Sequence, residues 1–139
     1  MNKLSLLLIA ALCVSLAGCS KDAEVNAFIT EFDATTKEIV AKIDANPSAA
    51  GMDEAQKAFD AKKASLKTKW DAIKTARGIQ VSAETKKKLE DSVAENMKAL
   101  TDVSSKNMMK LAMDKDAVTK FQKLMADYSA TFGQPTSAK

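Results

Sequence analysis

Histidine is absent from this chain of 139 residues, and its two cysteines both fall within the first nineteen. The lack of imidazole removes the commonest general base, the commonest metal ligand and every catalytic triad that depends on it. Glycine occurs only four times, which is too few to build a glycine-rich phosphate loop. These absences predict a protein that is not an enzyme and that holds no cofactor.

Proline is scarcer still, and after residue 21 the only breaks are Pro47, Gly51, Gly78, Gly133 and Pro135. Between them lie long stretches of Ala, Lys, Glu, Asp, Leu and Met, which are good or tolerable helix residues. The alternation of β-branched residues that is typical of strands is missing. The chain is therefore predicted to be all-α.

Charge of one sign is not in excess, since 21 basic residues face 18 acidic ones. Arg77 is the single arginine, although bidentate recognition of phosphate usually depends on arginine. The near balance argues against nucleic acid as a partner. Carboxylates stand at spacings that also hold lysine, as in Glu38 with Lys42, which predicts exposed ion pairs rather than an acid–base pair.

The N-terminus carries a long apolar run. Lys3 precedes Leu4 to Leu16, which is followed by the small residues Ala17 and Gly18 and then by Cys19. A basic start, an apolar centre and small residues before a cleavage point are typical of a secretory signal. The run of about 13 residues is too short to cross a bilayer core, which needs about 20.

The ending Leu16-Ala17-Gly18-Cys19 resembles the lipobox of bacterial lipoproteins. The resemblance implies that residues 1–18 are a cleaved signal peptide, and that Cys19 is lipidated, for example with palmitate, at the head of a short N-terminus, residues 19–21. In that family, Asp after the lipidated Cys is a signal for inner-membrane retention in many Gram-negative bacteria. Ser20 stands there instead, which implies the periplasmic face of the outer membrane, or the cell membrane if the organism is not Gram-negative. An ordinary signal peptide and an uncleaved N-terminal anchor are the alternatives.

Residues 22–133 are predicted to form one helical domain, followed by a short tail, residues 134–139. The first helix is expected from about Asp22 to Asn46, where Pro47 ends it. The second is expected from Asp53 to Arg77, because Asp53 with Gln56 resembles a capping box and Gly78 suits a helix end. The first helix has its apolar stripe at Ile29, Phe32, Thr36, Ile39 and Ile43.

A third helical stretch begins at Ser82 and meets no glycine until Gly133. A single helix of this length would reach about 75 Å, twice the length of the others, so the stretch is expected to fold back. The corner is predicted at Asp114–Asp116, which offers a helix cap, or at Thr101–Asn107, which is rich in poor helix formers; the first is slightly favoured. This predicts an antiparallel four-helix bundle. The alternative is a helical hairpin packed on one long helix, with coiled-coil character.

Basic residues bracket the expected turn around Gly78. Because Cys19 adjoins the first helix, an anchored bundle would bring this turn to the membrane, where each base near anionic lipid contributes about 1 kcal/mol. A solvated face is the plainer interpretation of such a run. The residues predicted to contact the membrane surface are Lys74, Arg77, Lys86, Lys87 and Lys88.

Methionine gathers in the C-terminal half, and Met109 and Met113 share a helix face. Thioethers can hold Cu(I), but filling of an irregular core or of a tolerant interface is strongly favoured over a metal site. Three polar residues interrupt the apolar stripe of the third stretch, namely Ser104, Asn107 and Asp114. They predict either a polar layer or small pocket, or, as favoured, the place where the chain turns.

The function predicted from these features is that of a small membrane-anchored periplasmic lipoprotein, a structural, adaptor or interaction module for envelope proteins. One alternative is an envelope tether, because the lipobox, Ser20 and the final Lys139 resemble Braun's lipoprotein, in which the terminal Lys is joined to peptidoglycan. The other is a carrier of a ligand or metal. The sequence leaves the partner and the oligomeric state open, including an oligomer.

Overall fold

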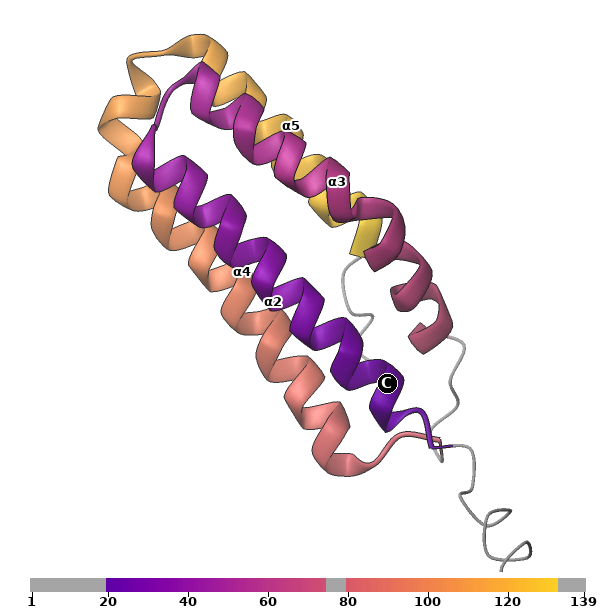
Figure 1. Ribbon diagram of the computed structural model, residues 1–139. Helices are drawn as coiled ribbons and strands as arrows, with labels where there is room; N and C mark the ends of the chain where they lie inside the picture. Colours follow the sequence, from indigo (N-terminus) through magenta and orange to yellow (C-terminus); the bar gives the residue numbers. More distant parts are fainter. Residues whose placement is uncertain (1–19, 75–79, 133–139) are drawn as a thin grey trace, which may run out of the picture.

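The computed structural model describes residues 20–74 and 80–132, which form four helices. They are α2 (Asp22–Ala45), α3 (Ala49–Lys74), α4 (Ala83–Ala112) and α5 (Lys115–Phe132). Consecutive helices run in opposite directions along one elongated bundle (Figure 1). The predicted all-α four-helix bundle is confirmed, and the alternative of a hairpin on one long helix is wrong.

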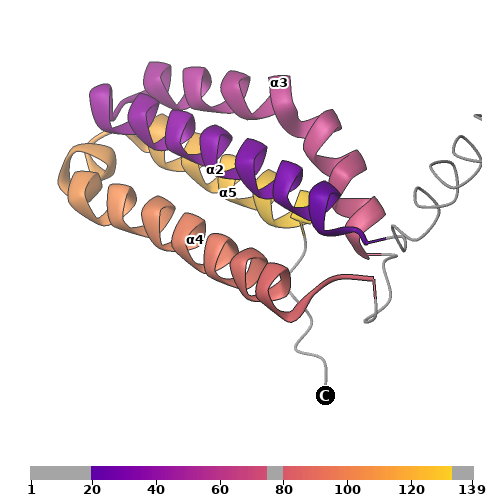
Figure 2. The same cartoon turned by 60° about the horizontal axis from the view of Figure 1, so that its bottom comes forward.

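Each helix packs against two others. α2 contacts α3 and α4, while α5 contacts the same two helices from the opposite corner, an arrangement that Figure 2 shows from a second side. The neighbours α2 and α4 therefore run parallel, as do α3 and α5. We call the end at which α2 begins the entry end, and the end that holds the connections α2–α3 and α4–α5 the turn end.

The core fills the space between all four helices. The predicted stripe of α2 is correct, since Phe32, Thr36, Ile39 and Ile43 are buried and Ile29 is partly buried. Tyr128 crosses from α5 to share a buried hydrogen bond of 2.8 Å with the Thr36 hydroxyl. Burial raises the pKa of the Tyr128 phenol well above its usual value, so this group stays neutral. Six aromatic rings contact one another in the core, namely Phe28, Phe32, Phe59, Trp70, Tyr128 and Phe132.

The corner between α4 and α5 lies at Asp114, the first of the two predicted places. Its carboxylate accepts the N–H groups of Asp116 and Ala117, each at 3.1 Å, which caps α5. The same carboxylate accepts the N–H of Ala49 at 3.0 Å, at the start of α3. One side chain thus caps two helices and fastens the two connections of the turn end to each other.

The Asp114 contacts predict a pH-dependent stability. The N–H groups, first of Ala117 and then of Ala49, hold the pKa of this carboxyl below its ordinary value of 3.8. A lowered folded-state pKa adds stability that is complete above the unfolded value and is lost as the pH falls through the folded value. At pH 7, Asp114→Ala is expected to lower the Tm by about 5 °C, the usual effect of a lost cap in a domain of this size.

The measurement is the Tm of the wild type and of Asp114→Ala between pH 7 and pH 2. The difference between them is expected to shrink once the pH falls below 3.8. Asp116→Ala is the control, because it removes a carboxylate from the same turn but removes no cap. A Tm difference that stays constant down to pH 2 would contradict this role of Asp114.

One of the predicted helix boundaries is wrong. α3 begins at Ala49, not at Asp53, so the expected capping box does not exist. Asp53 instead pairs with Lys120 of α5 at 2.5 Å. Gly51, expected to break the chain, lies inside the first turn of α3. There, the Ser48 carbonyl and hydroxyl accept the N–H groups of Met52 and Gly51.

The favoured prediction that the polar residues of the stripe mark a turn is wrong for Ser104 and Asn107, which lie within α4. Thr101–Asn107, the second candidate corner, lies inside the helix. Asn107 is buried there, and its amide donates to Asp44 of α2 at 3.2 Å. Ser104 lines a hollow between α4 and α5. Only Asp114 marks a turn, so the polar-layer and pocket interpretation is the correct one for the other two residues.

Candidate functional site

The entry end joins the start of α2 to the start of α4. The Lys21 N–H donates to the Gln80 carbonyl at 2.7 Å, and the Ser82 N–H donates to the Asp22 carboxylate at 2.8 Å. This backbone contact with Ser82 is the main reason that the pKa of Asp22 lies below its usual value. Ser82 in turn caps α4, as predicted, by accepting the Thr85 N–H. The segment that follows Cys19 is therefore fixed directly to the bundle.

Four of the five basic residues predicted to contact a membrane lie at this same end, Lys74 at the end of α3 and Lys86, Lys87 and Lys88 at the start of α4. Lys87 pairs with Asp91 at 2.6 Å and Lys88 with Glu84 at 2.8 Å, and these hydrogen bonds raise the pKa of both lysines. Lys74 lies over the ring of Trp70, 6.0 Å from its centroid. Cys19 and Arg77 lie outside the described residues. The membrane contact of the cluster remains a prediction.

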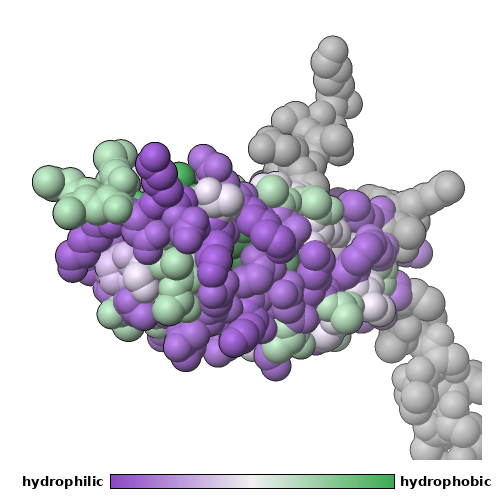
Figure 3. Space-filling view, turned by 90° about the horizontal axis from the view of Figure 1, so that it is seen from above, coloured by the Kyte–Doolittle hydropathy of each residue, from purple (hydrophilic) through white to green (hydrophobic). Residues whose placement is uncertain are grey.

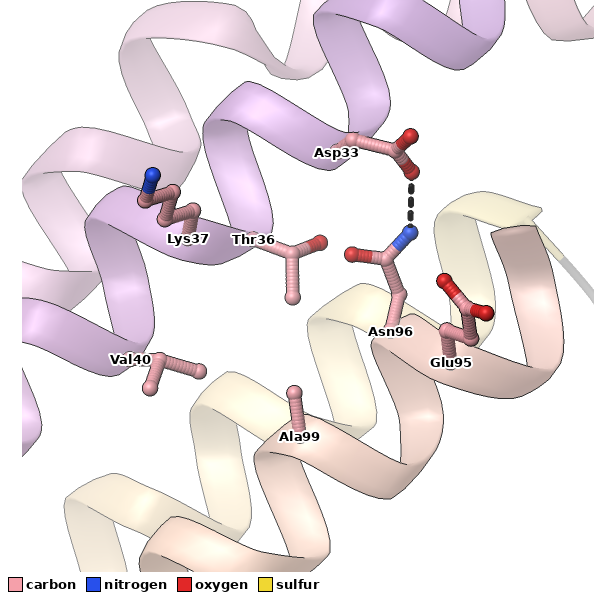
Figure 4. Close-up of a pocket in the computed structure, with 7 residues that line it drawn as sticks. All are labelled: Asp33, Thr36, Lys37, Val40, Glu95, Asn96 and Ala99. Atoms are coloured by element: carbon pink, nitrogen blue, oxygen red, sulfur yellow. Dashed lines mark hydrogen bonds between the residues drawn. The ribbon is translucent and has the colours of Figure 1, made fainter.

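A hollow of about 320 Å³ lies between the parallel helices α2 and α4. Figure 4 shows Asp33 and Thr36 of α2 facing Asn96 of α4 across it. Asn96 is 7% exposed, and its amide donates to Asp33 at 2.6 Å. Ser92, one turn earlier, donates to the same carboxylate oxygen at 2.5 Å. Val40 and Ala99 give the other half of the hollow an apolar lining (Figure 4).

Two charges of opposite sign stand at the rim of this hollow, Lys37 on α2 and Glu95 on α4 (Figure 4). Within residues 20–74 and 80–132, neither forms an ion pair, although ten other lysines do. A rim with both signs and a half-apolar lining suits a small solute that also carries both signs.

A second hollow, of about 300 Å³, lies between α4 and α5 near the turn end. None of its lining residues is charged; they are Ser104, Met108, Leu111, Ala112, Val118, Phe121 and Gln122. Three methionines of this end are exposed, Met108 by 63%, Met109 by 84% and Met113 by 90%, and of these Met108 lines the hollow. Figure 3 shows a group of hydrophobic side chains at the end of the molecule away from the grey segments.

The candidate metal ligands Met109 and Met113 are thus among the most exposed apolar residues of the turn end. In the described part of the chain, no group of three or more His, Cys, Asp or Glu side chains could hold a metal ion. The methionine pair as a copper site remains a prediction.

The polar pair Ser92 and Asn96 was missed by the sequence analysis. The two residues are four apart on α4 and share a face, which was a usable signal. The apolar residues that directly follow them, Val93 and Met97, are only partly buried.

None of the described helices is long and apolar enough to cross a membrane. Comparison of the chain with protein-family models, with curated proteins and with solved structures finds no match.

Proposed function

We propose that this protein is a small lipoprotein, anchored through Cys19 at the periplasmic face of the outer membrane, that acts as a structural or adaptor module for envelope proteins. The observation that carries the proposal is that the two ends of the bundle differ. Ser20, which follows Cys19, lies at the entry end, where Lys21 and Asp22 are hydrogen-bonded to Gln80 and Ser82 just before α4. The uncharged hollow and the exposed methionines lie near the opposite end.

This difference between the ends suits a protein that is anchored at one end and that binds a partner at the other. With only Ser20 and Lys21 between Cys19 and α2, an anchor at Cys19 would leave little slack. A bundle held in this way would point its turn end into the periplasm. α4 has 30 residues, so at 1.5 Å per residue the apolar surface would stand about 40 Å from the entry end.

The two alternatives are affected differently. α5 runs back toward the entry end, and its last described residue, Phe132, packs near Phe28 of α2, with ring centroids 6.0 Å apart. A last helix that ends near the entry end gives poor support to a tether between the membrane and the cell wall. The α2–α4 hollow favours a carrier of small solutes, and retention of a solute in native mass spectra of the purified protein would support that alternative.

The anchor is tested by replacing each cysteine in turn and measuring the mass of the N-terminal peptide from cells of a Gram-negative host. The wild type is expected to lack residues 1–18 and to carry acyl chains on Cys19. Cys19→Ala is expected to keep residues 1–18 and to carry no acyl chain. Cys13→Ala, a matched change within the predicted signal peptide, should behave as the wild type. An unmodified Cys19 in the wild type would contradict the proposal.

A further inference from the structure

Large apolar side chains are exposed at only one place in the part of the chain that the structure describes. They are Met108 and Met109, in the last two turns of α4, and Met113, which follows the end of that helix. Met109 and Met113 stand four positions apart, so they share one face. Side chains this exposed remove little apolar area from water, so they add little to the stability of the fold.

The other methionines among the described residues are shielded from solvent. Met52 of α3 is fully buried in the core, and Met97 of α4 and Met125 of α5 are partly buried against it. The bundle therefore holds its thioethers in two environments, one in the core and one in open solvent at the turn end. Leucine or glutamine would serve an exposed position equally well as far as packing is concerned. What methionine adds there is a sulfur atom that can be oxidised and then reduced again.

We propose that Met108, Met109 and Met113 form a site of reversible oxidation for two-electron oxidants such as hypochlorous acid. A thioether lone pair attacks the chlorine atom of hypochlorous acid, which releases hydroxide and leaves chlorine bonded to the sulfur. Water then adds to the sulfur, and chloride and two protons leave, which gives the sulfoxide. The sulfur has lost two electrons and the chlorine has gained them. Methionine sulfoxide reductases return the thioether.

The position of these residues makes their oxidation harmless to the fold. Each sulfoxide oxygen would lie in water, which supplies its hydrogen bonds. The same change at Met97 or Met125 would place a polar oxygen against the apolar core and would destabilise it. The exposed thioethers therefore consume oxidant that would otherwise reach the core methionines. This site depends on exposure alone, so it does not require the anchor at Cys19.

The first test measures oxygen uptake at each methionine of the purified full-length protein by tandem mass spectrometry of its peptides. With limiting hypochlorous acid, Met109 and Met113 are expected to react at least about tenfold faster than Met52, because oxidation follows exposure. The control is the same protein unfolded in urea, in which these residues should react at similar rates. Equal rates in the folded protein would overturn the proposal.

Reversibility is tested on the oxidised protein from the same experiment. Methionine sulfoxide reductases for both sulfoxide epimers, with a thiol reductant, are expected to restore the original mass of the peptides that hold Met108, Met109 and Met113. Protein incubated with the reductant alone is the control and should keep the added oxygen. Sulfoxides that the two enzymes leave unreduced in the folded protein would contradict a reversible site.

The second test measures protection of the core through the Tm after treatment with one molecule of oxidant for each exposed methionine. Wild type is expected to keep its Tm. A variant with Met108→Leu, Met109→Leu and Met113→Leu is expected to fold normally, since leucine and methionine are similar in volume. After treatment, its Tm should fall by at least about 4 °C, because the oxidant now reaches partly buried methionines.

The matched control carries Met97→Leu with Met125→Leu, which removes the partly buried thioethers and keeps the exposed ones. Its Tm should be the same with and without oxidant. A triple variant that keeps its Tm after treatment, or a wild type that loses several degrees, would overturn the proposed protection.

Discussion

Phe132→Ala is expected to lower the free energy of unfolding by about 4 kcal/mol, within the range measured for buried phenylalanines. The residue is only 6% exposed although it is the last residue of α5. Its ring meets five other rings at centroid distances between 4.9 and 6.4 Å. Those rings belong to α2, α3 and α5, so the truncation leaves a cavity where three helices meet. The measurement is equilibrium urea unfolding followed by far-UV circular dichroism.

The matched control is Phe121→Ala, the same truncation about three turns earlier on α5. Phe121 lines the hollow between α4 and α5 and is only partly buried, so we expect the free energy of unfolding to fall by about 1–2 kcal/mol. Trp70 gives a local readout, because its ring lies 6.4 Å from that of Phe132. Its fluorescence should shift to longer wavelength in Phe132→Ala and not in Phe121→Ala. Equal losses for the two variants would contradict a central role of Phe132.

The helices were predictable because local chemistry determines them. The 3.6-residue period set the stripe of α2, Pro47 ended that helix, and Ser82 and Asp114 supplied caps that bind the neighbouring N–H groups in the structure. The choice between the two corners also depended on local chemistry. A carboxylate that can cap a helix was a sharper signal than a run of poor helix formers, and α4 continues through Thr101–Asn107.

The pairing of helices was not predictable in the same way. A stripe identifies the face that a helix buries, but it does not identify the helix that covers it. The bonds of Asp44 to Asn107 and of Asp33 to Asn96 depend on α2 and α4 lying side by side and parallel. Residues 59 to 63 positions apart make these contacts, and nothing in the local sequence of either helix specifies that separation.

The candidate surfaces were predictable only in part. The concentration of methionine in the C-terminal half was visible, and a tolerant interface was among its interpretations. That Met108 lines an uncharged hollow depends on how far α4 and α5 separate, which is a result of packing. The basic residues around the second turn were expected at the entry end, and Lys74, Lys87 and Lys88 lie there. The pairing of Lys87 with Asp91 and of Lys88 with Glu84 was not predicted.

Gly51→Ala is expected to destabilise the bundle by about 2 kcal/mol, although alanine is the better helix former by about 1 kcal/mol. A β-carbon at this position would lie 1.7 Å from the carbonyl oxygen of Asn46 and 2.8 Å from its carbonyl carbon. The obstacle is backbone, so no side-chain rotation relieves it. Asn46 cannot move freely either, because its carbonyl accepts the Ser48 N–H at 2.8 Å and its N–H donates to Lys42 at 3.1 Å. The steric cost therefore exceeds the gain in propensity, and urea unfolding measures the difference.

Ala50→Gly is the control that separates the two effects. Ala50 is the preceding residue of α3 and is exposed, so its change to glycine alters propensity by up to about 1 kcal/mol and leaves the contact with Asn46 intact. If propensity alone governed this turn, Gly51→Ala would stabilise the protein by as much as Ala50→Gly destabilises it. The close approach of α3 to the end of α2 predicts that both changes destabilise, with the larger loss at Gly51. A Gly51→Ala protein as stable as the wild type would mean that the connection at Asn46 can shift without cost, and that the Asp114 contact with Ala49 does not hold it in place.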